Sequence, residues 1–304
     1  MRLLSSFNAV TATVLGLAMP SVALAQALEI VGAPVPRGTE HQPAATNIAA
    51  DLQWLDHTIL IIITAIVIFV TLLLVYIGIR YSAKRNPKPS TFTHNTPLEI
   101  VWTVVPILIL VFIGSFSLPA LFKQQEIPVA DITIKATGNQ WYWSYEYPDE
   151  EISFDAFRID ASTKINDPAA GWGDDQPMDT PAILNETALK KLAYYGYTRN
   201  EWLLATDNAV VIPVGKTIVM QVTGADVIHA WAMPAFGVMQ SAVPGRLGQL
   251  WFKAEREGIY FGQCTTLCGK DHAYMPITVK VVSQAAYDAW VLQAKGGNVL
   301  LAQK

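Results

Sequence analysis

The 304-residue chain is 52% hydrophobic with a mean hydropathy of +0.29, which is too apolar for an ordinary globular domain and indicates a segment that sits in lipid. Its net charge is only -4 and its basic residues form no long run, which argues against nucleic acid as a partner. Its two cysteines are too few for a disulfide scaffold.

Residues 1–25 have the composition of an export signal. Arg2 supplies a positive start, an apolar stretch follows, and small residues precede the predicted cleavage point, so we expect a mature chain that begins at Gln26. An uncleaved first helix is the alternative, although Pro20 interrupts the apolar run where a membrane span would continue. In both cases residues 26–57 are expected to form a periplasmic N-terminal segment.

Two long apolar runs predict a helical hairpin that crosses the membrane within residues 58–122. Thr58–Ile79 is uncharged, and at 1.5 Å per residue about 20 residues cross the ~30 Å hydrocarbon core. Leu98–Phe122 is the second run, with prolines inside it and one carboxylate, Glu99, near its start. The loop between the runs carries basic residues and no acidic ones, which places it in the cytoplasm and both chain ends outside. These basic residues are Arg80, Lys84, Arg85 and Lys88.

Residues 123–304 contain short runs of β-branched and aromatic residues separated by turn residues, which predicts a small all-β sandwich or barrel. Pro213-Val214-Gly215-Lys216 is predicted to be a hairpin turn between two strands. A terminal helix is expected from about Gln284. The predicted strands are Asp131–Thr137, Trp141–Tyr147, Ala209–Pro213, Thr217–Thr223, Leu247–Lys253, Gly258–Gly262 and Ile277–Val282.

An insertion near residues 160–200 interrupts this β pattern. Residues 166–181 are rich in Gly, Pro and Asp, which predicts a surface loop, and a short helix is expected from Thr180 to about Tyr195. A solvated loop is the simpler interpretation, and a binding element is the alternative.

One short segment gathers both cysteines of the chain together with one of its five histidines and one of its seven methionines. Cys264, Cys268, His272 and Met275 follow one another at spacings of four, four and three residues. Thiolate, imidazole and thioether together suit copper better than calcium, magnesium or a four-thiolate zinc site. A fifth donor is predicted at His229, which is expected to begin a loop after a strand, with a structural histidine as the alternative.

The cysteine pair has three other interpretations. A disulfide between Cys264 and Cys268 would leave His272 and Met275 without a role. A mononuclear blue-copper site needs only one thiolate, so the second cysteine argues against it. A copper-delivery protein with a thioredoxin-like fold would require alternating helices and strands, which the sequence does not contain.

Several motifs resemble subunit II of the haem-copper cytochrome c oxidases, and the resemblance covers Gln53 to about Trp290. In that family a two-helix transmembrane hairpin carries an all-β cupredoxin-like Greek-key barrel that holds a binuclear copper centre. The resemblance implies that Cys264 and Cys268 bridge two copper ions, while His229, His272, Met275 and the Thr266 backbone carbonyl complete the ligands. The motifs are residues 92–99 (FTHNTPLE), 138–147 (GNQWYWSYEY), 243–246 (VPGR) and the copper loop at 262–276.

The resemblance also implies a respiratory function in the bacterial inner membrane, with both termini and the copper domain in the periplasm. Cytochrome c would reduce the copper pair, which would pass electrons to haem in subunit I, where oxygen becomes water and protons are pumped. Subunit I, subunit III and membrane lipid are the expected partners. The alternatives are a membrane-anchored copper-delivery protein and a structural, copper-free subunit of a quinol oxidase.

Further residue roles follow from the same resemblance. Trp141 matches the position where electrons from cytochrome c enter, Glu99 matches the entrance of a proton channel, and Arg246 matches a residue near the haem propionates. A half-buried strand tryptophan and a helix-end glutamate are the simpler alternatives for the first two. Acidic residues are expected to attract a basic cytochrome c, or else are simply solvated. These are Glu146, Asp149, Glu150, Glu151, Asp207 and Asp226.

Two positions depart from the family pattern. Relatives usually have glutamate where this chain has Thr266, and aspartate where it has Ser241, and both carboxylates lie near a magnesium or manganese ion at the subunit interface. Hard divalent cations prefer carboxylate oxygens, so we expect this ion to be absent or weakly held. The Thr266 carbonyl is retained, so copper binding should survive.

Overall fold

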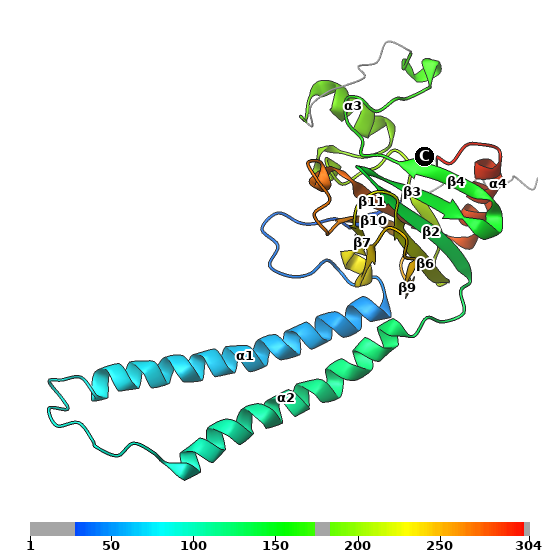
Figure 1. Ribbon diagram of the computed structural model, residues 1–304. Helices are drawn as coiled ribbons and strands as arrows, with labels where there is room; N and C mark the ends of the chain where they lie inside the picture. Colours follow the sequence, from blue (N-terminus) through cyan, green and yellow to red (C-terminus); the bar gives the residue numbers. More distant parts are fainter. Residues whose placement is uncertain (1–27, 174–182, 301–304) are drawn as a thin grey trace, which may run out of the picture.

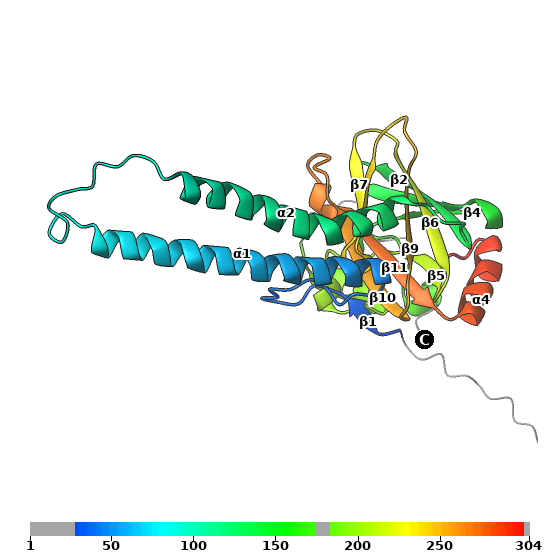
Figure 2. The same ribbon diagram turned by 90° about the horizontal axis from the view of Figure 1, so that it is seen from below.

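The computed structural model describes residues 28–173 and 183–300 and comprises a helical hairpin and a β domain (Figure 1). The predicted signal peptide and part of the insertion loop lie outside the described residues. The hairpin consists of α1 (Asn47–Arg80) and α2 (Thr96–Gln125). Figures 1 and 2 show it projecting from one end of the β domain.

The two hairpin helices expose apolar side chains on all sides, as expected of membrane spans rather than of surface helices. With 34 and 30 residues, each is longer than the roughly 20 residues that cross a bilayer core. Helix α1 therefore begins well before the predicted span at Thr58. Its first turn rests on the β domain, where the Thr46 hydroxyl donates to the Phe236 carbonyl oxygen at 2.7 Å.

The β domain contains two sheets. One has the order β5-β11-β10-β7-β8, with β1 paired to β10, and the other has the order β4-β3-β2-β6-β9. The strands of the first sheet are β1 (Ile30–Gly32), β5 (Val210–Pro213), β7 (His229–Met233), β8 (Val238–Ala242), β10 (Gly258–Cys264) and β11 (Pro276–Val282). Those of the second are β2 (Ile132–Asn139), β3 (Tyr142–Tyr147), β4 (Ile152–Ala156), β6 (Thr217–Gly224) and β9 (Gly248–Lys253).

Side chains from both sheets meet in one core. Alternate residues of β3 point inward, so Trp143, Tyr145 and Tyr147 are fully buried beside Trp231 from β7. The parallel pairs β2 with β6 and β5 with β11 require the chain to cross between sheets, as in a Greek-key barrel. The predicted transmembrane hairpin with a cupredoxin-like barrel is confirmed.

The predicted hairpin turn at residues 213–216 is wrong. Gly215 adopts a left-handed φ of 74° and reverses the chain, but β5 and β6 lie in different sheets and do not pair. Turn residues report only that the chain reverses, whereas the partner of each strand is decided by how the core closes. The prediction also missed the short strands β1, β4, β7 and β8.

The insertion packs on the outer face of the barrel through the residues that the structure describes. Helix α3 (Glu186–Tyr194) buries Leu192 against Phe261 of β10 in a second apolar cluster. The buried Lys191 ammonium donates to the backbone carbonyls of Ala161, at 2.8 Å, and Thr163. The predicted C-terminal helix is confirmed as α4 (Gln284–Lys295), whose Trp290 enters the main core.

Candidate metal centre

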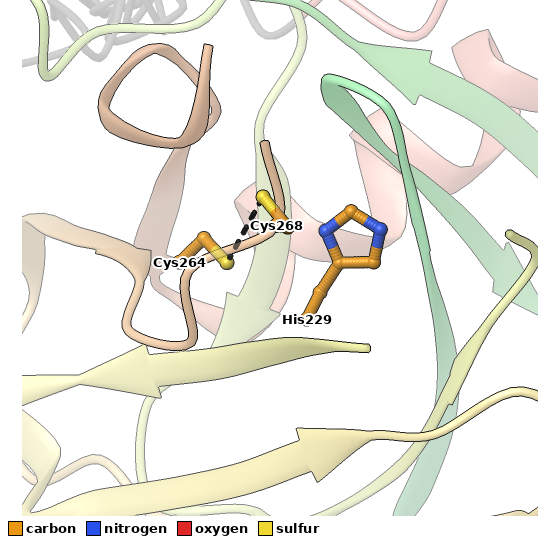
Figure 3. Close-up of side chains that lie close together, drawn as sticks. All are labelled: His229, Cys264 and Cys268. Atoms are coloured by element: carbon orange, nitrogen blue, oxygen red, sulfur yellow. Dashed lines mark hydrogen bonds between the residues drawn. The ribbon is translucent and has the colours of Figure 1, made fainter. Parts of the chain in front are cut away.

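The cysteines, His229 and the other predicted donors meet at one end of the barrel. Cys264 is the last residue of β10 and pairs with Trp231 of the neighbouring strand β7. His229 is the first residue of β7, not of a loop as predicted, so the antiparallel pairing carries it to the cysteines. Figure 3 shows its ring beside the two sulfur atoms.

The donor atoms of the copper loop converge on Cys268. Its Sγ lies 3.9 Å from Cys264 Sγ, 3.6 Å from His272 Nδ1 and 3.5 Å from Met275 Sδ. The Thr266 carbonyl oxygen lies 3.2 Å from Cys264 Sγ. Both cysteines are free and buried, and their separation is nearly twice the ~2.05 Å of a disulfide bond. The disulfide interpretation therefore does not describe this structure.

His229 presents a ring nitrogen that is available for a metal. The ring is completely buried, and its Nε2 lies 2.8 Å from Asp226 Oδ1. Within the described part of the chain, the buried Nδ1 has no hydrogen-bond partner. A buried nitrogen without a partner costs free energy unless something binds it. The ligand atoms of His229, Cys264 and Cys268 lie within 4.8 Å of one another, so one metal site could use all three.

Two glycines and an indole shape this neighbourhood. A Cβ on Gly138 would come 2.8 Å from the His229 ring, so β2 leaves space for the imidazole only because it has glycine there. Trp143 lies beside the same ring, with centroids 6.1 Å apart, and its Nε1 donates to the Met275 carbonyl at 3.3 Å. A Cβ on Gly269 would come 2.9 Å from the Trp141 ring.

The thiols do not ionise independently. Burial opposes ionisation of Cys264, but the adjacent His229 imidazole and nearby backbone groups outweigh it and hold its pKa below the usual value. Burial and the adjacent Cys264 sulfur raise the pKa of Cys268 well above its usual value. A bound cation is needed to keep both sulfurs as thiolates. The donor set of two cysteine sulfurs, two imidazoles and a methionine thioether therefore fits a copper centre.

Trp141 and its neighbour Gln140 contact the metal-binding loop directly. Gln140 Nε2 and Trp141 Nε1 both donate to the carbonyl oxygen of Cys268, at 2.9 and 3.3 Å. The backbone N–H of Gln140 donates to Asp226 Oδ2 at 2.7 Å. Asp226 therefore holds both His229 and this turn, a role that the sequence did not reveal although its position three residues before His229 could have suggested it.

The six predicted docking carboxylates do not lie together. Glu146, Asp149, Glu150 and Glu151 lie toward the far end of β3, and at about 3.3 Å per residue Glu146 is already roughly 15 Å from Trp141. Glu146 and Glu150 pair with lysines, Lys135 and Lys295, at 2.8 and 2.7 Å.

Asp207 and Asp226 serve local structure rather than a shared surface. Asp207 accepts hydrogen bonds from the backbone N–H groups of Phe157 and Asn208, and burial raises its pKa to about 7. A carboxyl with this pKa is only partly ionised at neutral pH. The predicted acidic docking surface is not a continuous patch.

The remaining predicted residues lie in separate places. Glu99 is in the first turn of α2, at the end of the hairpin remote from the β domain, where its Oε1 accepts from the Asn95 backbone N–H at 3.1 Å. Arg246 is exposed in the loop between β8 and β9. This loop follows Ala242, which pairs with His229, so Arg246 lies at the same end of the barrel as the metal centre. Ser241 pairs with Ala230 in the same ladder.

Comparisons with known proteins agree over most of the chain. Residues 34–120 match the family described as "Cytochrome C oxidase subunit II, transmembrane domain", and residues 132–178 and 172–282 match "Cytochrome C oxidase subunit II, periplasmic domain". Cytochrome c oxidase subunit 2 of Cereibacter sphaeroides is 59% identical over 281 residues, which are 92% of this chain and 88% of the relative. Probable cytochrome c oxidase subunit 2 of Rickettsia bellii is 38% identical and covers 88% of this chain and 90% of its own.

Among solved structures, the periplasmic domain of subunit II of cytochrome oxidase of Bradyrhizobium japonicum is 42% identical, with a TM-score of 0.42. It covers 58% of this chain and 100% of its own. The family matches and the identity to full-length relatives show that this chain belongs to the cytochrome c oxidase subunit II family, as a membrane-anchored subunit of a terminal oxidase with a periplasmic domain.

Proposed function

We propose that this chain receives electrons from cytochrome c at a binuclear copper centre and delivers them to haem in subunit I, where oxygen is reduced to water and protons are pumped. The observation that carries the proposal is the pair of free sulfur atoms 3.9 Å apart, flanked by His229, His272 and Met275. Two thiolates at this spacing can bridge two metal ions. The Thr266 carbonyl supplies a further oxygen ligand.

The chain's own residues provide a short route to this centre. Trp141 is half-buried at the surface, and its indole N–H is one hydrogen bond from the carbonyl of Cys268. When bound, the copper pair would supply a one-electron acceptor whose charge is shared by both ions. The buried ligands are held by strands β7 and β10 and by Trp143, so their positions change little when the charge changes.

The test uses the full chain, purified in detergent and loaded with copper. We expect two copper ions per chain and an electron paramagnetic resonance spectrum in which one unpaired electron is shared by two copper nuclei. A mononuclear spectrum with one copper would contradict the binuclear assignment. A chain that binds no copper would favour the structural subunit of a quinol oxidase, and transfer of its copper to another protein would favour copper delivery.

Subunit contact is proposed at the metal end of the barrel. Large apolar side chains are exposed there on the copper loop, on strand β8 and on the loops that precede β7 and β9, as at a surface covered by a partner. We propose that subunit I covers this surface, with Arg246 reaching haem propionates, and that subunit III and lipid contact the hairpin in the inner membrane. The apolar residues are Val227, Ile228, Met239, Leu247 and Leu267.

Glu99 is proposed to admit protons from the cytoplasmic side. Replacing Glu99 by Gln keeps an oxygen for the Asn95 N–H but removes the ionisable group, whereas Ala removes both. If the carboxyl carries protons, both variants should slow reduction of the oxygen-binding haem by at least about tenfold, measured by stopped-flow absorption in the assembled oxidase. Slowing by Ala alone would assign Glu99 to capping of α2, which is worth about 1 kcal/mol.

The magnesium or manganese ion at the subunit interface is proposed to be absent or weakly bound. Metal analysis of the purified oxidase should find substoichiometric magnesium and manganese, because Thr266 and Ser241 offer no carboxylate. The double variant Thr266→Glu with Ser241→Asp should gain a manganese signal, while the uncharged pair Thr266→Gln with Ser241→Asn should not. Stoichiometric, tightly bound manganese in the parent oxidase would contradict the proposal.

A further inference from the structure

Lys270 lies over the ring of Trp141. Its Nζ is 5.4 Å from the indole centroid, within the range of a cation-π contact, and its side chain is 76% exposed. The lysine sits in the copper loop between Cys268 and His272, and the preceding Gly269 lets the indole approach the backbone closely. A positive charge therefore stands at the surface point nearest to the indole.

Nearby carboxylates offset part of this charge but are less exposed than the ammonium. Asp271 lies 3.5 Å from Lys270 Nζ, and its side chain is 38% exposed against 76% for Lys270, whose Nζ is the group that lies over the indole. Asp226 is engaged by His229 and by the backbone N–H groups of Gln140 and Val227. The acidic residues from Glu146 to Glu151 lie toward the other end of β3.

A cavity on the barrel surface beside Trp141 is lined by both basic and acidic side chains, so it adds no preference of its own to that of Lys270. It has a volume of about 410 Å³, and its lining includes Trp141 and Tyr274, the basic Arg158 and Lys164, and the acidic Asp160 and Asp207. The Arg158 guanidinium lies 4.7 Å from the Tyr274 ring and pairs with Asp160. Lys164 is exposed at the rim of this cavity.

We propose that Lys270 is a specificity-determining residue, which favours a redox partner that brings an anionic group to the indole of Trp141 and disfavours one that brings a cationic group there. The inference rests on the proposed function, because it assumes that electrons enter at Trp141. It differs from the expectation that acidic residues attract a basic cytochrome c, because it assigns the opposite preference to the contact at the indole.

Small inorganic reagents of opposite charge test this contact without needing the natural partner. The copper-loaded full chain is reduced, and its oxidation by ferricyanide, a trianion, and by tris(phenanthroline)cobalt(III), a trication, is followed by stopped flow. At low salt, Lys270→Gln should lower the rate of oxidation by the trianion about fivefold. The rate of oxidation by the trication should stay equal or rise, and both differences should fade at high salt. Lys270→Arg, which keeps the charge, should restore the parent rates.

Two control variants separate the inference from the proposed function. Lys253→Gln removes an exposed lysine at the end of β9 that pairs with Thr217, remote from the copper loop, and should change neither rate. Trp141→Phe should lower the rates of oxidation by both reagents to the same extent. If Trp141→Phe slows both reagents but Lys270→Gln changes neither rate, the inference is wrong and the proposed function stands. If Trp141→Phe changes nothing, the proposed site of electron transfer itself is wrong, and if the chain holds no reducible copper, the proposed function fails.

Discussion

Replacing Cys268 by serine is expected to abolish the binuclear centre and reduce oxidase turnover by more than about 100-fold. Cys268 Sγ is the atom on which the other donors converge, since Cys264, His272 and Met275 all lie within 3.9 Å of it. A serine hydroxyl is a hard donor that does not ionise at neutral pH, so it cannot bridge two copper ions as a thiolate can. Serine preserves the size of the side chain, which separates loss of the ligand from loss of packing.

Copper content and the electron paramagnetic resonance spectrum measure this result. The variant should bind at most one copper, with a spectrum that shows a single copper nucleus. Thr266→Ala is the matched control in the same loop, because it removes a side chain but keeps the backbone carbonyl, and it should retain both copper ions. A Cys268→Ser variant with an unchanged two-copper spectrum would show that Cys268 is not a bridging ligand.

Replacing Gly138 by alanine is expected to weaken copper binding on the order of 10–100-fold while the barrel stays folded. The added Cβ would come 2.8 to 2.9 Å from three atoms of His229, closer than nonbonded carbon atoms approach. The ring must move, which disturbs the hydrogen bond between His229 Nε2 and the Asp226 carboxylate that orients it. Since His229 Nδ1 is the orphaned nitrogen that faces the sulfurs, its displacement removes a ligand without changing the ligand's identity.

Copper titration of the full chain measures this effect, and circular dichroism of the copper-free chain reports whether the fold persists. Gly114→Ala in α2 is the control, because none of the residues that the structure describes lies within 4 Å of a Cβ at that position, and it should bind copper like the parent. If Gly138→Ala binds copper as tightly as the parent, then either strand β2 shifts to make room for the added methyl group or His229 is not a ligand. Replacing His229 by Ala in the same assay distinguishes these two results.

Much of the site could be predicted because its donors follow one another in a single loop. Cys264, Cys268, His272 and Met275 are separated by three or four residues, so their chemistry is visible without any knowledge of the fold. His229 was found as a residue but placed wrongly, because a loop and the first residue of a strand look alike in sequence. The structural role of Asp226 was missed, although its position three residues before His229 could have suggested it.

The predicted docking carboxylates are spread over the barrel for a related reason. The carboxylates from Glu146 to Glu151 are close in the sequence, which suggested a patch. Along strand β3, however, each successive residue lies about 3.3 Å farther from Trp141. Asp207 is far from them in the chain and lies buried against backbone N–H groups. Burial and ion pairing therefore decide which carboxylates present a charge, and neither can be read from composition.

The sequence by itself determined the membrane hairpin and the class of metal, because both depend on properties of contiguous segments: hydropathy over about 20 residues and donor types within one loop. Only the tertiary structure decided that β5 and β6 belong to different sheets, that Gly138 makes room for His229, and that Lys270 covers Trp141. These features arise from contacts between residues distant in the chain. Their energies exist only after both sheets have closed around the core, so no local pattern records them.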